Sequence, residues 1–156
     1  MGLGRDWRAL KARHLKGQSD RAVTKSVRNL GSNVCTNRWT EDDVRSFASD
    51  SRHLIFTLHS SDRFGNLGLV AFVHATIDGG SAEIVDWVMS CRAMNRRIEF
   101  AMEGEVERNL ASRGVKKIAA TWKRTAKNNP VENLFDAFGF ELVESAPGLR
   151  RYKRPL

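Results

Sequence analysis

The hydrophobic pattern changes its period near residue 53, and this change limits the folds open to the chain. Before that point the apolar residues are spaced as in helices. Afterwards come three segments of strand length, separated by turn sequences rich in Asp, Gly and Asn. Short connections of this kind predict consecutive antiparallel strands. The expected strands are His53–Leu58, Leu67–Ala75 and Ala82–Met89.

A long amphipathic helix is predicted directly after these strands, over residues 95–113. One stripe of this helix is apolar and is expected to face the core, whereas a second stripe is acidic and is expected to face solvent. The apolar stripe consists of Ile98, Met102, Val106 and Leu110. The acidic stripe consists of Glu99, Glu103 and Glu107.

The remaining segments complete an α+β pattern. A strand, a helix with Pro130 in its first turn and a final hairpin follow the long helix, over residues 117–122, 129–137, 141–145 and 150–153. Before the strands we expect a short basic helix or arm, a second helix, a loop and a capped helix, over residues 5–16, 20–30, 32–37 and 40–48. This order predicts a mixed, mostly antiparallel sheet flanked by helices.

The net charge predicts an anionic partner. The chain of 156 residues has the size of one domain and a formal net charge of +8 at pH 7. The basic excess lies at the two ends, so we divide the chain into a basic arm or helix over 1–25 and a domain over 26–156. No apolar run approaches the roughly 20 residues of a membrane span, and no secretory signal is present. The two cysteines, Cys35 and Cys91, fit a reduced, cytoplasmic setting.

The junction between the third strand and the long helix is the strongest candidate for a binding site. Free N–H groups at a helix start attract anions, and Arg92, Arg96 and Arg97 add fixed positive charge there. Phosphate is therefore the expected ligand. The alternative is a basic turn that is only solvated.

Several short motifs in this order resemble the GNAT acyltransferase fold. They are Arg92-x-x-Asn95-x-Arg97, Asn129-Pro130-Val131 and Phe138-Gly139-Phe140. The chain more closely resembles the carboxyl-terminal domain of FkbH-like proteins of polyketide pathways, over about residues 26–153. The matching stretches are Ser61-Asp62-Arg63-Phe64-Gly65 with Gly68-Leu69-Val70, Met89-Ser90-Cys91-Arg92, and Thr125-Ala126-Lys127-Asn128-Asn129-Pro130-Val131.

The resemblance implies a ligand and partners. Its ligand would be coenzyme A, acyl-CoA or the phosphopantetheine arm of an acyl carrier protein, with the pyrophosphate on the arginine turn and the pantetheine along splayed strands. FkbH-like proteins also carry a phosphatase-like domain with an Asp-x-Asp motif, which this chain lacks, so a separate phosphatase-like partner is implied. The residues implied in binding are Val88, Met89, Ser90, Arg92, Asn95, Arg96, Arg97, Ile98, Asn129 and Phe135.

The sequence departs from the family pattern at three positions. Asn95 and Arg97 stand where the family has glycine, so their side chains either narrow the site or, for Arg97, bind phosphate directly. Phe135 stands where the family has the tyrosine that protonates the leaving thiolate. The chain's one tyrosine, Tyr152, lies in the last strand. Ordinary amine acetylation therefore lacks its usual general acid.

Two side chains are candidates for catalysis. Cys91, beside Arg92 and before a helix, is a candidate nucleophile, although a buried structural thiol is the simpler interpretation. Asp86 is a candidate general base, and strand alternation places it on one face with Ile84 and Val88. Glu83 is interpreted as a structural strand acid.

The three histidines near the sheet do not have the spacing of metal ligands and are interpreted as structural. They are His53, His59 and His74. Three functions remain open. The first is an acyltransferase or acyl-thioester handling domain, the second is a GNAT-fold partner-binding module that has lost catalysis, and the third and least favoured is nucleic-acid binding through the basic arm.

Overall fold

The computed structural model describes residues 7–14, 32–33, 39–62, 65–90, 93–94 and 96–156. The strands are β1 (Trp7–His14), β2 (Ser32–Asn33), β3 (His53–Asp62), β4 (Gly65–Asp78), β5 (Ser81–Met89), β6 (Lys117–Lys123), β7 (Glu141–Ala146) and β8 (Leu149–Pro155). The helices are α2 (Glu41–Ser49), α3 (Ile98–Ser112) and α4 (Leu134–Ala137), and a 3₁₀ turn, η1 (Asn129–Val131), precedes α4.

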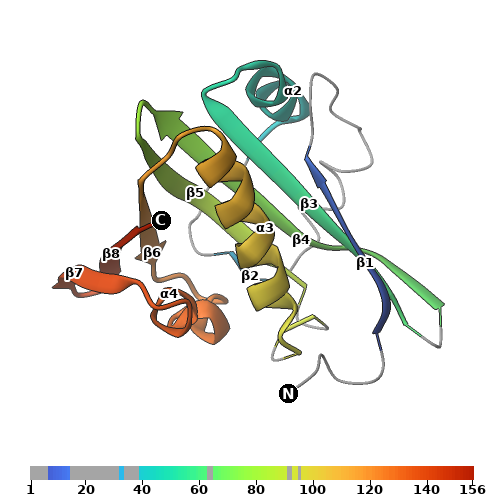
Figure 1. Cartoon of the computed structure of the whole chain (residues 1–156). Coiled ribbons are helices and arrows are strands. Elements are labelled where there is room, and N and C mark those ends of the chain that lie inside the picture. The colour runs from blue at the N-terminus through green and yellow to red at the C-terminus, as the bar shows by residue number, and fades with distance from the viewer. Residues whose placement is uncertain (1–6, 15–31, 34–38, 63–64, 91–92, 95) are drawn as a thin grey trace.

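The strands form one mixed sheet with helices on both faces (Figure 1). Its order is β1-β3-β4-β5-β6-β8-β7, and β2 pairs with β5 off this path. Every neighbouring pair of described strands is antiparallel except β5 and β6, which are parallel. The predicted α+β fold, a mixed and mostly antiparallel sheet flanked by helices, is confirmed.

Strands β3, β4 and β5 form the antiparallel meander that the change in hydrophobic period predicts. A two-residue turn, Gly79-Gly80, joins β4 to β5. Gly79 has φ 54°, a left-handed conformation that glycine adopts without the steric cost of a side chain. The meander supplies much of the core, because most side chains of β4 and β5 between Val70 and Met89 are buried on both faces.

The apolar stripe of α3 faces the core as predicted. Ile98, Met102, Val106 and Leu110 are all buried. The acidic stripe is not simply solvated, which corrects the sequence expectation. Arg154 of β8 forms ion pairs with Glu103 and, at 3.5 Å, with Glu107, because the last strand runs along this flank of the helix. Among the described helices, none combines the length and apolar composition needed to cross a bilayer.

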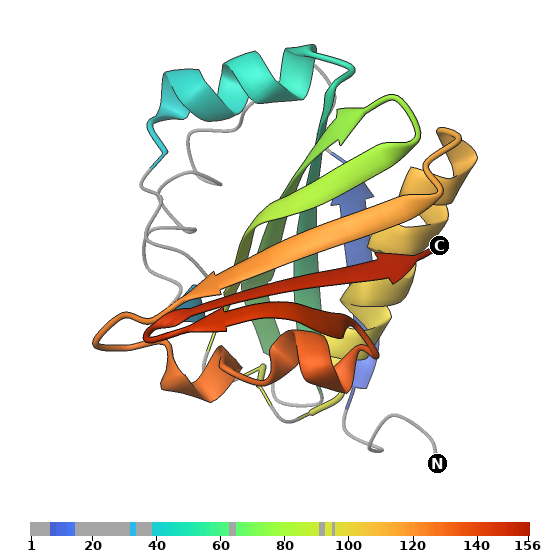
Figure 2. The same ribbon diagram turned by 90° about the vertical axis from the view of Figure 1, so that its left-hand side faces the viewer.

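Helix α2 covers the opposite face of the sheet from α3 (Figure 2). It begins with the predicted capping box, in which the Asp43 backbone N–H donates to Thr40 Oγ1 at 3.1 Å and the Thr40 N–H donates to Asp43 Oδ2 at 2.8 Å. Its residues Val44 and Phe47 pack on the sheet as expected. The protein therefore has two separate apolar layers, one under each helix.

The helix expected over residues 5–16 is wrong, because residues 7–14 form strand β1. This strand pairs antiparallel with β3, from Trp7 opposite Asp62 to His14 opposite Phe56. The helix propensity of Ala, Leu, Lys and Arg is weak compared with pairing along a free strand edge. The abundant Lys and Arg of this segment suit an edge strand, where charge discourages further pairing.

Two other expectations need correction. The predicted helix over 129–137 is divided into η1 and α4, with Pro130 at the start of η1, so no single helix spans the segment. In the predicted loop over 32–37, Ser32 and Asn33 form strand β2, because they pair with the edge of β5. The helix predicted over 20–30 lies outside the described residues.

Candidate functional site

The parallel strands β5 and β6 separate after a short stretch of pairing. They pair from Ser81 opposite Lys117 to Ile84 opposite Ala120, and no further. Beyond this point β6 continues to pair with β8, and β5 continues to pair with β4. The two central strands thus leave a gap between the carboxyl-terminal ends of β5 and β6 (Figure 2).

The short strand β2 lies on the edge of β5 that β6 has left. Ser32 pairs with Met89 and Asn33 pairs with Val88, while the other edge of the same residues pairs with β4. Strand β2 also lies against η1, which follows β6. The gap is therefore bounded by β5, β6 and η1 and contains two residues of the amino-terminal region.

A bulge in β5 decides the direction of its side chains. Ala75 of β4 is opposite Ile84, but the neighbouring His74 is opposite Asp86, so β5 has one more residue than β4 at this point of the ladder. Ile84 and Trp87 consequently pack in the core under α3, whereas Val88 packs under α2. The sequence analysis placed Asp86 on the same face of the strand as Ile84, and this prediction is wrong because of the bulge.

Asp86 lies in a fully buried polar cluster. Its Oδ2 accepts a hydrogen bond from Trp39 Nε1 and lies 3.8 Å from His74 Nδ1. His74 Nε2 and His53 Nδ1 share a hydrogen bond of 2.8 Å, and the Phe47 ring stacks on both imidazoles. The cluster links the buried carboxylate to His53, which is half-buried.

We expect His53 to make the protein less stable in acid. Burial, together with the neighbouring His74, lowers the pKa of His53 below its usual 6.5. The unfolded chain then binds more protons than the folded one as the pH falls below about 6.5, so the free energy of unfolding decreases. In His53→Gln this part of the pH dependence should disappear between pH 7.5 and 5, measured by urea unfolding. His59→Gln, a second histidine of β3, is the control, and an NMR titration midpoint of His53 above 6.5 would contradict the expectation.

The turn before α3 carries two of the three predicted arginines in the described part of the chain. Arg96 and Arg97 are exposed, and the Arg97 guanidinium lies 5.9 Å from the centre of the Phe100 ring. Arg97 precedes the first helical residue and has φ 64°, a left-handed conformation that residues with a side chain seldom adopt. Cys91, Arg92 and Asn95 lie outside the described residues.

Five of the predicted binding residues meet at this end of β5. Val88 and Met89 are buried in the last two positions of the strand, and the Ser90 N–H donates to Val70 O at 2.9 Å. Ile98 is buried at the start of α3. Asn129 begins η1, which β2 connects to Met89. The helix itself begins at Ile98, three residues later than predicted.

Phe135 of α4 is buried in the same apolar cluster as Met89 and Ile98. Its ring centre is 5.5 Å from that of Tyr152 and 5.4 Å from that of Phe140, and the side chain is fully buried. The Tyr152 hydroxyl donates to Asp136 Oδ2 at 2.9 Å. Burial raises the pKa of Tyr152, which makes this hydroxyl a weaker acid than usual.

The sequence analysis did not predict that the Asn128 side chain fixes the loop between β6 and η1, beside the gap. The Asn128 amide donates to Lys123 O at 2.6 Å, and its Oδ1 accepts from the Thr125 N–H at 2.7 Å. These two bonds fix the loop from β6 to η1. The position of this asparagine, directly before Asn129-Pro130, could have indicated the role, because short amide side chains often form hydrogen bonds with nearby backbone groups.

Comparison with known proteins shows the fold. No family model and no curated protein sequence matches the chain. Among solved structures, the PaiA N-acetyltransferase from Thermoplasma acidophilum in complex with coenzyme A matches with a TM-score of 0.72 and 10% identity, over 95% of this chain and 99% of that chain. The ribosomal-protein-S18-alanine N-acetyltransferase from Escherichia coli matches with a TM-score of 0.66 and 14% identity, over 94% of both chains.

A third similar structure is the IAA acetyltransferase from Bacillus cereus ATCC 14579, with a TM-score of 0.66 and 10% identity over 95% of this chain and 100% of that chain. At such identities the similarity establishes the fold. The chain has the fold of GNAT N-acetyltransferases.

Proposed function

We propose that this protein transfers an acyl group from a coenzyme A thioester to a small acceptor. The observation that carries the proposal is the separation of β5 and β6 beside a turn with exposed arginines. The pantetheine arm of coenzyme A is an extended chain with amide groups, which could pair with the strand edges that β5 and β6 no longer share if it replaces β2 there. The arginines suit its pyrophosphate.

The described residues fit this ligand in charge and in backbone shape. Arg96 and Arg97 would hold phosphate, and the left-handed Arg97 keeps a turn in which backbone N–H groups gather before α3. Val88, Met89 and Ser90 would line the arm, with Asn129 facing it across the gap. Arg92 and Asn95 belong to the same proposed turn, and Phe135 would contribute only through the packing under α4.

The acyl carbon of the bound thioester would bond to the acceptor nitrogen or oxygen while its carbon–sulfur bond breaks and the sulfur leaves as a thiolate. The acceptor must also lose a proton, and the thiolate takes up a proton from water to become the free thiol. We propose Asp86 as the group that receives the acceptor's proton, through His74 and His53 or water, because His53 and His74 share a hydrogen bond and His74 Nδ1 lies 3.8 Å from the Asp86 carboxylate. Cys91 remains the proposed alternative, as a nucleophile that carries the acyl group before transfer.

A carrier-protein phosphopantetheine arm is the second donor form that we propose. It ends in the same pantetheine thioester as coenzyme A, so the same gap would accept it. The basic charge of the chain favours an acidic carrier protein. With this donor, the protein would act in secondary metabolism, as its resemblance to FkbH-like proteins implies. A separate phosphatase-like protein would then supply the loaded carrier protein.

A partner-binding module without catalysis is the alternative function. It is favoured by Phe135, which places a buried phenyl ring where the family has its acidic hydroxyl. Turnover distinguishes the two functions. Release of free thiol from acetyl-CoA in the presence of an acceptor, reduced at least tenfold in Cys91→Ala or Arg92→Ala, would argue against the binding module.

The decisive binding experiment is a calorimetric titration of coenzyme A at low salt, with Arg97→Gly as the variant. Glycine relieves the left-handed strain, so we expect the free energy of unfolding to rise by up to about 1 kcal/mol. If Arg97 grips phosphate, the Kd should increase about tenfold, because a charged hydrogen bond contributes about 1.5–3 kcal/mol. If Arg97 narrows the site instead, the Kd should decrease.

Arg108→Ala is the matched control, because Arg108 is an exposed arginine of α3 that forms an ion pair with Glu105. Its coenzyme A affinity should equal that of the unchanged protein. The unchanged protein failing to bind either coenzyme A or a loaded carrier protein would refute the proposed function.

A further inference from the structure

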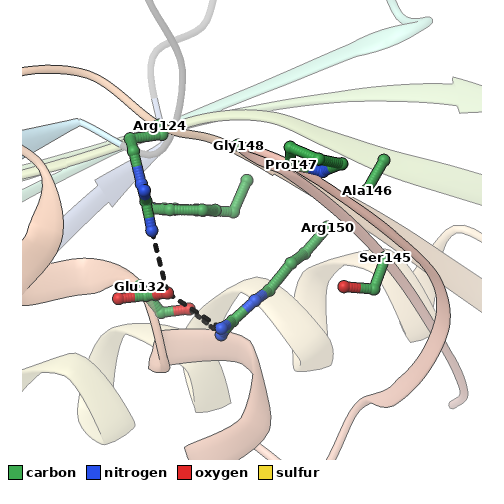
Figure 3. Close-up of a pocket in the computed structure, with 8 residues that line it drawn as sticks. Arg124, Glu132, Ser145, Ala146, Pro147, Gly148 and Arg150 are labelled. Carbon is green, nitrogen blue, oxygen red and sulfur yellow. Dashed lines mark hydrogen bonds and ion pairs between the residues drawn. The ribbon is translucent and has the colours of Figure 1, made fainter.

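A pocket of about 380 Å³ lies where β6 ends, apart from the arginine turn before α3 (Figure 3). Its walls come from three places: the end of β6, the segment between η1 and α4, and the turn between β7 and β8. The residues used below are Trp122, Arg124, Glu132, Ser145 and Arg150. The volume is within the range of small-molecule sites, about 300–1,000 Å³.

The pocket borders the gap between β5 and β6. Trp122 belongs to the part of β6, residues 121–123, that no longer pairs with β5. Arg150 of β8 is directly opposite Trp122 in the ladder. A ligand in the pocket would therefore lie beside the strand that forms one wall of the proposed donor cleft.

The polar lining consists mainly of hydrogen-bond donors. Arg124 and Arg150 present guanidinium groups, whose carbons lie 6.0 Å and 5.6 Å from the centre of the Trp122 ring. Trp122 Nε1 is buried and has no hydrogen-bond partner in the part of the chain that the structure describes. Ser145 adds a hydroxyl. Groups of this kind select a ligand that accepts hydrogen bonds.

The two arginines differ in how firmly they are held. Arg150 donates to Glu132 Oε1 at 2.8 Å and to Asn133 Oδ1 at 3.0 Å, and it lies 4.0 Å from Asp136 outside the pocket. Arg124 is 62% exposed and approaches Glu132 only to 3.9 Å, beyond hydrogen-bond length. Figure 3 shows both arginines extending toward Glu132 from opposite sides. The Arg124 guanidinium is therefore the one whose N–H groups can donate hydrogen bonds to a ligand.

The charge of the lining favours a ligand with one negative charge. Two guanidinium groups and one carboxylate, that of Glu132, leave one net positive charge among the described residues that line the pocket. A phosphate dianion would exceed this charge, whereas a carboxylate matches it and has the planar shape that a guanidinium binds with two bonds.

We propose that this pocket binds the carboxylate of the acyl acceptor, with Arg124 as its guanidinium partner and Trp122 Nε1 as a second donor. Glu132 is a positioning residue, because it holds Arg150 and approaches Arg124. The proposal rests on the proposed acyl-transfer function and names its substrate class: a small acceptor that bears one carboxylate.

Binding can be tested without turnover. The indole N–H resonance of Trp122, assigned with Trp122→Phe, is followed in ¹H–¹⁵N NMR spectra during titration with sodium benzoate and with neutral benzamide. We expect a saturable shift with benzoate only, weakened at least tenfold in Arg124→Gln. Arg151→Gln is the matched control, because Arg151 is an exposed arginine of β8 that pairs with Glu144. An equal response to benzoate and benzamide, or an unchanged response in Arg124→Gln, would overturn the proposal.

The acceptor class is tested by turnover of acetyl-CoA with L-phenylalanine against L-phenylalaninamide, and with other amine acceptors in matched pairs. Carboxylated acceptors should have the higher kcat/KM by at least tenfold, and Arg124→Gln should remove the preference by raising the KM for the carboxylated acceptor.

The phosphates of coenzyme A are the other negative groups that could occupy the pocket, and a coenzyme A titration of Arg124→Gln tests this. A large loss of affinity for coenzyme A in this variant would assign the pocket to the donor's phosphates and refute the proposal. Failure of coenzyme A to bind the unchanged protein would refute the proposed function, while the benzoate result would still stand on its own.

Discussion

Replacing Asp86 with alanine is expected to lower the free energy of unfolding by about 3 kcal/mol. The carboxylate is fully buried, accepts the Trp39 indole N–H and lies 3.8 Å from His74. Its removal leaves the Trp39 N–H without its acceptor and opens a cavity among buried side chains. An unsatisfied buried donor alone costs about 1–3 kcal/mol. Urea unfolding monitored by circular dichroism measures the difference.

Two further variants separate the structural role of Asp86 from its proposed role as a base. Glu83→Ala, at an exposed acid of the same strand, should change stability by less than about 0.5 kcal/mol. Asp86→Asn keeps an oxygen for the Trp39 N–H but cannot take a proton, so it should lose less stability than Asp86→Ala. If Asp86→Asn stays folded and loses turnover at least a hundredfold, the base role is supported. An Asp86→Ala protein with unchanged stability would contradict the structural account.

Replacing Phe135 with alanine is expected to cost about 3–5 kcal/mol, the range for truncating a buried phenylalanine. The ring is fully buried and contacts the rings of Phe138, Phe140 and Tyr152, so its loss leaves a cavity between α4 and the last strands. Thermal and urea unfolding should both report the loss. Phe135→Leu, which fills most of the cavity, should cost much less.

Phe135→Tyr tests whether the family's hydroxyl can be restored. The new hydroxyl would lie among aromatic rings, and burying it without a partner costs about 1–3 kcal/mol. We expect lower stability without increased turnover, because the position is fully buried in the apolar core, against the rings of Phe138 and Phe140, which offer no acceptor for the new hydroxyl. A gain of tenfold or more in turnover would instead place this position within reach of the leaving thiol.

The fold was largely predictable because its signals are local. The two-residue glycine turn, the apolar stripe from Ile98 to Leu110 and the capping box at Thr40 each depend on neighbouring residues, and each is present as expected. Strand β1 was missed because its pairing with β3 is a contact between distant segments. No local pattern in Trp7–His14 distinguishes an edge strand from a basic helix.

The candidate site was less predictable because one bulge reorders its side chains. The two-residue turn after Asp78 would place His74 opposite Val85 if the ladder were regular, but the bulge places it opposite Asp86. A single inserted residue therefore creates the polar cluster under α2, and strand alternation cannot foresee it. The pocket at the end of β6 was missed for a similar reason, since Arg124 and Glu132 are brought within 3.9 Å of each other only by the loop that the Asn128 side chain fixes.

If a donor binds between β5 and β6 as proposed, strand β2 would compete with it for the edge of β5. Ser32 and Asn33 hold the edge of β5 at Met89 and Val88, and a donor arm that pairs with the same backbone atoms must replace them. The observed affinity is then the intrinsic affinity multiplied by the fraction of molecules whose edge is open. The sequence around residue 32 thereby sets the donor concentration at which the cleft fills, and substitutions far from any reacting atom can tune it.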